Sequence, residues 1–158
     1  MKKLKVGWFS FSCCEDSTII FTEILNDYYR IWKEKVEFVS VGVLQKRSKI
    51  KDLDVAFVEG AITSEKQEKQ LLNIRAESKK LVAIGACACV GMPSTQRNLF
   101  DEATKKEIEN ILIRFKYAEK VKKLSEVVTV DDQVPGCPMD ENAFLQIINK
   151  YLNEFNIS

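Results

Sequence analysis

The 158-residue sequence contains no histidine, only three prolines and six glycines, and almost no net charge. Without histidine, the most common zinc ligand and the most common general base are both missing. Lys and Arg number 24 against 23 Asp and Glu, whereas a nucleic-acid-binding surface needs a concentration of basic side chains. We therefore expect no nucleic-acid partner. No run of roughly 18 apolar residues is present, so we also expect no membrane-spanning helix.

The few prolines and glycines do not form a linker, and no internal repeat or low-complexity tract divides the chain. At 46% hydrophobic residues the sequence can bury a core, and its length suits one domain over residues 1–158. A secretory signal is not expected, because the first apolar stretch is short, contains Lys5 and ends in acidic residues. We therefore expect a cytoplasmic protein whose five cysteines are reduced and serve as metal ligands or core residues.

Short apolar runs rich in Val and Ile alternate with helical patterns along the chain. Most runs lack a polar alternation, as expected for strands that helices cover on both faces. Their alternation with helices predicts an α/β fold with a doubly wound parallel sheet, for which we expect a flavodoxin-like strand order in a single domain. The runs are Leu4–Phe9, Val36–Val41, Leu53–Val58, Leu81–Ile84 and the weaker Val127–Val130.

The predicted helices carry apolar faces, and two of them begin at recognisable capping residues. Ser64, with Gln67 three residues later, predicts a capping box, and Asp140 is a good N-cap for the last helix. Gln45–Lys51 is expected to be a solvated connection, and Lys116–Lys123 either another connection or an extension of its helix. The apolar faces are Ile20, Ile24, Tyr28 and Ile31, flanked by Phe21, Leu25 and Trp32; Ile108, Ile111, Leu112 and Phe115; and Phe144, Leu145, Ile148, Tyr151 and Leu152.

Every cysteine lies just beyond a predicted strand. Cys13 and Cys14 follow the first strand, Cys87 and Cys89 the fourth, and Cys137 the fifth. In a parallel sheet the carboxyl ends of the strands lie on one edge, where ligands bind. The sequence therefore predicts that thiols far apart in the chain meet at this edge.

Four thiolates without a histidine can hold a zinc ion or an iron–sulfur cluster. Structural zinc usually takes close pairs of cysteines on small loops, whereas these cysteines are scattered around a sheet with its own core. Adjacent cysteines also suit two irons of a cube better than one tetrahedral ion. The residues alone leave open a cluster, a zinc site, and buried or redox-active thiols without metal. A flavin-binding flavodoxin is disfavoured, because Phe9–Ser17 offers no glycine for a phosphate-binding loop.

Three motifs resemble the small subunit of [NiFe] hydrogenases and the related small electron-transfer subunit of respiratory complex I. They are VAFVEGAI at Val55–Ile62, AIGACA at Ala83–Ala88 and SEVVTVDDQVPGCPMDE at Ser125–Glu141. The similarity is greatest to the cytoplasmic hydrogenases that couple to nicotinamide, deazaflavin or heterodisulfide partners. It implies a proximal [4Fe–4S] cluster whose ligands come from an N-terminal cysteine motif and from Cys87 and Cys137.

The N-terminal motif departs from the hydrogenase pattern G-C-x-G-C. Cys14 fits the first cysteine of that pattern, but the second falls on Ser17, and the preceding glycine has become Cys13. Complex I subunits use two tandem cysteines here, which implies Cys13 and Cys14, with Cys87 and Cys137, as the four ligands. The alternatives are that Ser17 ligates through oxygen, or that three cysteines form the site and Cys13 is spare. Cys89 has no ligand counterpart and is expected to be a small buried residue.

The resemblance implies an electron-transfer subunit of an oxidoreductase that performs no catalysis itself. One cluster is expected, because no cysteine follows Cys137. The implied partners are a large subunit with the nickel–iron site and a further iron–sulfur or flavin subunit that accepts electrons. The alternative is the cluster subunit of a complex-I-like or hydrogenase-related oxidoreductase without nickel. Glu15 and Glu59 resemble residues that line proton routes or face the large subunit; alternatively, Glu15 with Asp16 begins a helix, where carboxylates suit the dipole.

Overall fold

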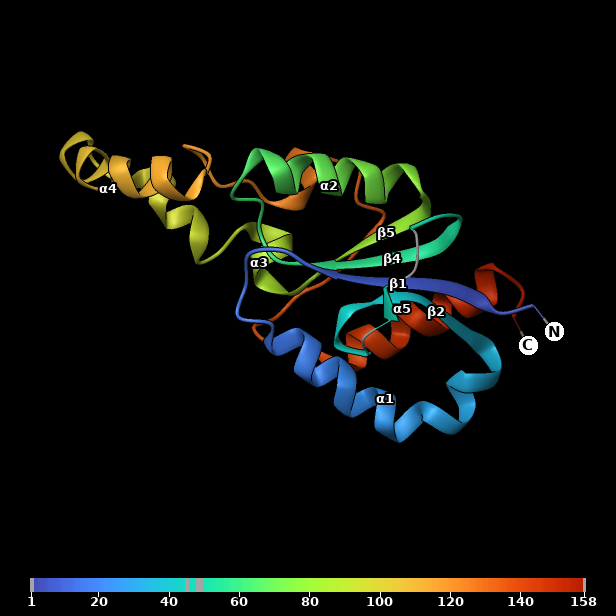
Figure 1. Cartoon of the computed structure of the whole chain (residues 1–158). Helices are drawn as coiled ribbons and strands as arrows, with labels where there is room; N and C mark the ends of the chain where they lie inside the picture. Colours follow the sequence, from blue (N-terminus) through green and yellow to red (C-terminus); the bar gives the residue numbers. More distant parts are fainter. Residues whose placement is uncertain (1, 45, 48–49, 158) are drawn as a thin grey trace.

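A computed structural model describes residues 2–44, 46–47 and 50–157 of the chain. Its sheet has the strand order β3-β2-β1-β4-β5-β6. Five strands are parallel, and the short β3 pairs antiparallel with β2 at one edge. Without β3, the order is 2-1-3-4-5 along the chain, so the predicted flavodoxin-like fold is confirmed (Figure 1). The strands are β1 (Leu4–Ser10), β2 (Val36–Val41), β3 (Lys46–Arg47), β4 (Leu53–Glu59), β5 (Ser78–Ile84) and β6 (Asp132–Val134).

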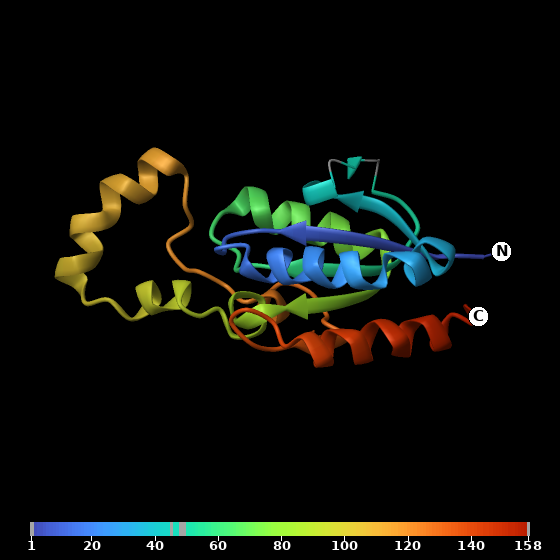
Figure 2. The ribbon, with the colours of Figure 1, turned by 90° about the horizontal axis from the view of Figure 1, so that it is seen from below.

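Helices cover both faces of the sheet. As Figures 1 and 2 show, α1 and α5 lie on one face and α2 on the other, while α4 extends away from the body. None of the helices in the described part of the chain is both long and apolar enough to cross a membrane. The α-helices are α1 (Asp16–Lys35), α2 (Glu65–Ala76), α3 (Gly85–Val90), α4 (Glu102–Phe115) and α5 (Glu141–Glu154), and the 3₁₀ helices are η1 (Gly42–Leu44), η2 (Ser94–Leu99) and η3 (Leu124–Glu126).

Two apolar cores lie on the two faces of the sheet. Under α1 and α5, Trp8 stacks on Phe21 with ring centroids 4.4 Å apart, and Phe144 packs edge-on against Phe57 at 5.2 Å. Burying each of these rings contributes roughly 1.5–3 kcal/mol. The second core joins β4 and β5 to α2 and α3. Both cores hold the strands rigidly, so the loops at their carboxyl ends start from fixed positions.

Most of the predicted apolar face of α1 is buried, but Ile31 is not. The buried stripe of this helix runs through Phe21, Ile24, Leu25 and Trp32, whereas Ile31 is 54% exposed. Each residue turns a helix by about 100°, so Ile31 lies about 20° around the axis from Ile24 and about 80° from Phe21, at the edge of the buried stripe. Ile31 therefore lies on the predicted side of the helix but is exposed rather than part of the core.

The predicted helix caps are present at Ser64 and Asp140. The Ser64 hydroxyl accepts the N–H of Gln67 at 3.3 Å, and the Asp140 carboxylate accepts the N–H of Ala143 at 2.7 Å. The Gln67 side chain, however, accepts the N–H of Thr63 at 2.8 Å rather than that of Ser64. The second hydrogen bond of the capping box is therefore made one residue earlier than predicted.

Residues 127–130 do not form a strand, so the prediction at Val127–Val130 is wrong. The ladder with β5 begins only at Asp132. Val128 is buried in the core beneath α2, and Val127 and Val130 pack against the same core. Burial without strand pairing explains the apolar character of this segment.

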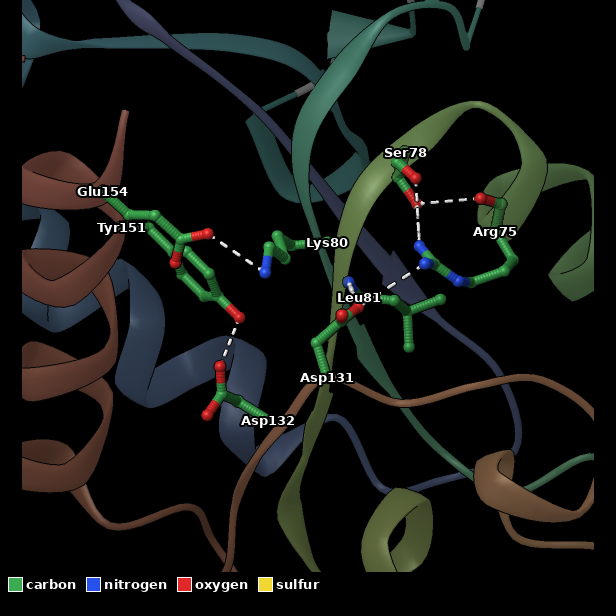
Figure 3. Close-up of polar contacts among 8 residues, drawn as sticks. All are labelled: Arg75, Ser78, Lys80, Leu81, Asp131, Asp132, Tyr151 and Glu154. Carbon is green, nitrogen blue, oxygen red and sulfur yellow. Dashed lines mark hydrogen bonds and ion pairs between the residues drawn. The ribbon is translucent and has the colours of Figure 1, made fainter. Parts of the chain in front are cut away.

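Asp131 and Asp132 fix where β6 begins, as Figure 3 shows. The Asp131 carboxylate accepts the N–H of Leu81 at 2.8 Å and lies 3.6 Å from the Arg75 guanidinium. Asp132 accepts a hydrogen bond from the Tyr151 hydroxyl and from Lys150 at 2.7 Å. These contacts join β6 to β5, α2 and α5, and so position the loop that carries Cys137.

The arm, defined as residues 92–120, leaves the body between α3 and η3. Its helix α4 has no buried residue, so the apolar face predicted there is not packed against the sheet. The Asn98 amide pairs with both backbone groups of Val121 at 2.8 Å, and Arg97 donates to the Ala118 carbonyl at 2.6 Å. These bonds join the outgoing and returning segments at the base of the arm.

The structure describes only part of the predicted connection Gln45–Lys51 but all of Lys116–Lys123. Residues 45, 48 and 49 of Gln45–Lys51 lie outside the described residues, and β3 forms within the segment. Helix α4 ends at Phe115, where Lys116 takes a left-handed conformation with φ 56°. Lys116–Lys123 is therefore a connection and not an extension of the helix.

Candidate functional site

Three loops at the carboxyl ends of β1, β5 and β6 converge on one pocket, called here the cysteine pocket. Its lining includes Cys13, Cys14, Cys87 and Cys137, together with Ser17, Glu59 and the backbone of Gly60, Gly85 and Gly136. The thiols of these four cysteines therefore meet at one edge of the sheet although they are far apart in the sequence. Their role as ligands stays a prediction.

The loop that carries the tandem cysteines is tied to the end of β4. The N–H of Phe11 donates to the Glu59 carbonyl at 2.9 Å, and Ser12 and Ala61 exchange two backbone hydrogen bonds of 3.1 and 3.0 Å. Gly60 makes this close approach possible, because a Cβ at its φ of 93° would lie 2.7 Å from the Phe11 backbone.

Polar side chains at the start of α2 and directly before it hold the same loop from its other side. The Gln67 amide donates to the Ser12 hydroxyl at 3.0 Å, which itself lies 2.7 Å from the Thr63 hydroxyl. Two independent sets of hydrogen bonds thus fix the chain directly before Cys13. Nothing in the sequence marked Gln67 for this role beyond its helix-capping pattern.

The loop after β6 is tied to α1 and α3. The N–H of Ala86 donates to the Gly136 carbonyl at 2.7 Å. The buried Ser17 hydroxyl accepts the N–H of Met139 at 3.2 Å. Gly136 has a φ of 114°, and a Cβ there would lie 2.5 Å from the Pro138 carbonyl oxygen. Ser17 therefore joins two of the cysteine loops, a role that its sequence position did not indicate.

The four thiols differ in exposure, and none of them is in a disulfide. Cys14 and Cys137 are exposed, Cys13 is half-buried and Cys87 is buried. Burial, followed by the nearby Glu59 carboxylate, raises the pKa of the Cys13 thiol to about 12. Burial and the neighbouring Cys14 and Cys137 raise the pKa of Cys87. In the absence of a cation, these two thiols stay protonated at neutral pH.

Glu59 is a buried carboxylate at the back of the cysteine pocket. It is only 2% exposed and accepts hydrogen bonds from Thr18 at 2.6 Å and Ser10 at 2.9 Å. Thr18 in turn accepts the indole N–H of Trp8 at 2.8 Å. These three side chains therefore fix the carboxylate and offset the cost of burying it.

Glu15 occupies the N-cap position of α1, but its side chain makes no capping hydrogen bond. Its φ of 65° is left-handed, which turns the chain sharply after Cys14. Its exposed side chain lines both the cysteine pocket and a larger groove beside it. Glu15 therefore lies at the start of the helix, as one interpretation predicted, but its carboxylate does not accept a hydrogen bond from the first turn.

Cys89 lies outside the cysteine pocket. It is 6% exposed, packs in the core beneath α2, and its thiol donates to the Ala83 carbonyl at 3.5 Å. Burial raises its pKa to about 11. It is the small buried residue that the sequence led us to expect.

Among the described residues, no group of three or more His, Cys, Asp or Glu side chains is arranged to hold a single metal ion. A tetrahedral zinc ion draws its ligands onto one centre. A cube distributes them over different irons and so holds their sulfurs farther apart. As the four thiols stand in this structure, they do not form such a single-ion site.

Comparisons with known proteins show similarity to one protein family and to subunits of hydrogenases. The family described as NADH ubiquinone oxidoreductase, 20 Kd subunit, matches residues 13–151. The NAD-reducing hydrogenase HoxS subunit delta of Cupriavidus necator is 25% identical over 167 residues, covering 96% of this chain and 79% of its own length. A subunit of the F420-non-reducing hydrogenase of Methanothermobacter marburgensis is 28% identical over 164 residues, but the alignment spans 93% of this chain and only 53% of that protein.

A solved structure shares the fold. The crystal structure of an NAD⁺-reducing [NiFe]-hydrogenase in the H₂-reduced state contains a chain that superposes with a TM-score of 0.79. It is 22% identical in sequence, and the match covers 96% of this chain and 93% of that one. The relatives are subunits of hydrogenase complexes, as the sequence motifs indicated. Because the match to residues 13–151 spans most of the chain, this protein belongs to the family of the 20 Kd subunit of NADH ubiquinone oxidoreductase, which confirms the resemblance.

Proposed function

We propose that this chain is the electron-transfer small subunit of a [NiFe] hydrogenase complex and that Cys13, Cys14, Cys87 and Cys137 bind one [4Fe–4S] cluster. The observation that carries this proposal is the convergence of these four cysteines, from three loops, on one pocket. Thiolates are the usual ligands of such clusters. The hydrogenase relatives support the assignment of the complex.

The residues of the pocket fit such a group. Three glycines line it, so at these positions the backbone can lie close to a cluster without a side chain in the way. Only about 20 Å³ of this pocket is open, so the cysteine side chains must move apart for a cluster to bind between them. Cys13 and Cys87 must also lose their protons, which the positive charge of iron favours.

Ser17 is better explained as a positioning residue than as an oxygen ligand. Its hydroxyl already accepts the N–H of Met139, which would lose its partner if Ser17 turned toward a metal. Cys13 lies in the same pocket and supplies the thiol that the serine lacks. The tandem pair therefore provides two of the four proposed ligands.

When bound, a [4Fe–4S] cluster carries single electrons between partner centres. The chain fixes its position, limits solvent access and sets its potential through burial and nearby charge. Glu59 places a negative charge beside Cys13, which disfavours adding an electron. The exposed Cys14 and Cys137 lie on the rim from which partners can approach.

The proposed partners are a large subunit with the nickel–iron site and an iron–sulfur or flavin subunit that accepts electrons. A cytoplasmic location would keep the five cysteines reduced, and none of them forms a disulfide. No acid, base or nucleophile of this chain is assigned to the chemistry of hydrogen.

A second candidate is the cluster subunit of a complex-I-like oxidoreductase without nickel. Two observations favour it: the tandem Cys13–Cys14 pair and the description of the matching family. Both candidates use the same pocket and the same four cysteines, and they differ only in the large subunit.

Anaerobic co-purification of the native complex, followed by metal analysis, tests the proposal. We expect iron and acid-labile sulfide with this chain, and nickel with its large subunit. Iron without nickel would favour the second candidate. A preparation without iron would contradict both.

A further inference from the structure

In its described residues, the connection between β2 and β4 lacks the helix that a parallel crossover usually supplies. Parallel neighbours in a sheet are normally joined through a helix that covers one face. In the described part of residues 42–52 there is only the 3₁₀ turn Gly42–Leu44 and the two-residue β3. One face of the sheet over β1 and β2 is therefore left without a helix.

The apolar side chains on this face are incompletely covered. Phe9, Phe11, Val39 and Ile50 are only partly buried, although they pack against the core beneath α2. On the opposite face of β1, which α1 and α5 cover, Trp8 is 3% exposed. The difference between the two faces of the same strand follows from the missing helix.

A groove of about 1640 Å³ lies over this region, between α2 and the end of α4. A helix of 10–12 Å diameter with a rise of 1.5 Å per residue occupies roughly 120–170 Å³ per residue. The groove is therefore on the scale of a short helix. Its apolar lining includes Phe9, Phe11 and Ile50, together with Val43, which has 46% of its surface exposed.

The two walls of the groove carry opposite charges. The α2 wall has Lys66 and Lys69 with one acid, Glu65, while the arm contributes two acids with one lysine. In the part of the chain that the structure describes, no ion pair joins these side chains to another residue. The acids and lysine of the arm wall are Glu109, Glu119 and Lys116.

We propose that an amphipathic helix of a partner subunit docks in this groove and replaces the missing crossover helix. Its apolar stripe packs on Phe9, Phe11 and Ile50, its acidic side faces α2, and its basic side faces the arm. The proposal rests on the proposed function, because it requires a complex. Glu15 lines both the groove and the cysteine pocket, so the docked helix also lies beside the proposed cluster.

Charged substitutions in the groove test this proposal in the native complex. Val43→Asp and Ile50→Asp place a carboxylate where the apolar stripe must pack. We expect each to lower the amount of co-purifying partner subunit by about tenfold or more, because the buried carboxylate would have no partner. Ile31→Asp is the matched control, since Ile31 is exposed on α1 outside the groove, and it should keep the partner at the wild-type level.

Iron per chain, measured on the same samples, separates this proposal from the proposed function. All three variants should hold as much iron as the wild-type protein. The docking proposal alone is overturned if both groove variants keep full iron and co-purify as much partner subunit as the wild-type protein. It is also overturned if iron is present but no partner subunit co-purifies even with the wild-type protein. Absence of iron from the wild-type protein overturns the proposed function.

A photo-reactive benzoylphenylalanine in place of Val43 identifies the occupant. Crosslinking to a helical segment of the partner subunit supports the proposal. A crosslink between two copies of this chain assigns the groove to self-association and overturns it. A crosslink within one copy shows that the chain covers its own groove, which overturns it as well.

Discussion

At the residue scale, the proposed ligands are held by neighbours that are not themselves ligands. Gln67 and Glu59 fix the tandem cysteine loop, and Ser17 fixes the loop of Cys137. The cysteines could be found in the sequence, because thiols have few other uses at strand ends in a reduced protein. Their neighbours could not, since Ser and Gln are common residues whose roles depend on contacts between distant loops.

Substitutions of individual cysteines separate ligands from the buried Cys89. Cys13→Ser and Cys137→Ala should each lose most of the bound iron, because a cluster needs all four thiolates. Cys89→Ser should retain it, since its thiol lies in the core outside the pocket. The measurement is iron per chain after anaerobic purification. Full iron in Cys13→Ser would show that Cys13 is spare.

Ser17→Ala distinguishes a positioning role from ligation. We expect a loss of about 1–3 kcal/mol in the free energy of unfolding, because the buried N–H of Met139 loses its acceptor. The iron content should stay close to that of the wild-type protein. An iron loss as complete as that of Cys137→Ala would instead identify Ser17 as a ligand.

Gly60→Ala tests the close contact that holds the tandem cysteine loop. The new Cβ would lie 2.7 Å from the Phe11 backbone in a left-handed conformation, so unfolding free energy should fall by about 2–5 kcal/mol. Gly42→Ala is the control: its Cβ meets nothing within 4 Å, and the change should stay within about 0.5 kcal/mol. Denaturant unfolding measures both, and equal effects would refute the argument.

At the scale of elements, apolar runs identified four strands but misplaced the fifth. Leu4–Phe9, Val36–Val41, Leu53–Val58 and Leu81–Ile84 all lie within observed strands. Val127–Val130 is a weaker apolar run, and its valines pack against the core beneath α2 without pairing as a strand. The start of β6 depends on polar contacts of Asp131 and Asp132, which hydrophobic patterns do not reveal.

The anchor of β6 makes stability depend on pH at the acid end. Burial alone would raise the pKa of Asp132, but hydrogen bonds from Lys150 and Tyr151 outweigh it, and the pKa is lowered. The stabilisation is then fully present above the unfolded value of about 3.9 and is lost as pH falls through the folded value. In Asp132→Asn, the free energy of unfolding should therefore fall less steeply than in the wild-type protein as the pH is lowered below about 4. A slope identical to that of the wild-type protein would count against this anchor.

At the scale of the whole molecule, the fold brings sequence-distant thiols to one place. Parallel topology predicted that the cysteines after the strands would share an edge. Cys13, Cys14, Cys87 and Cys137 line one pocket there, whereas Cys89 lies in the core. The arm and the uncovered groove could not be predicted in the same way. The apolar face of α4 looked like core in the sequence, but which elements stay uncovered depends on the complete arrangement of crossovers.

The most direct test of the account is the iron and acid-labile sulfide content of the wild-type chain, purified with its partners without oxygen. The account predicts about four of each per chain, bound as one cube by four cysteines. A chain that holds no iron, or one zinc ion in its place, would contradict it.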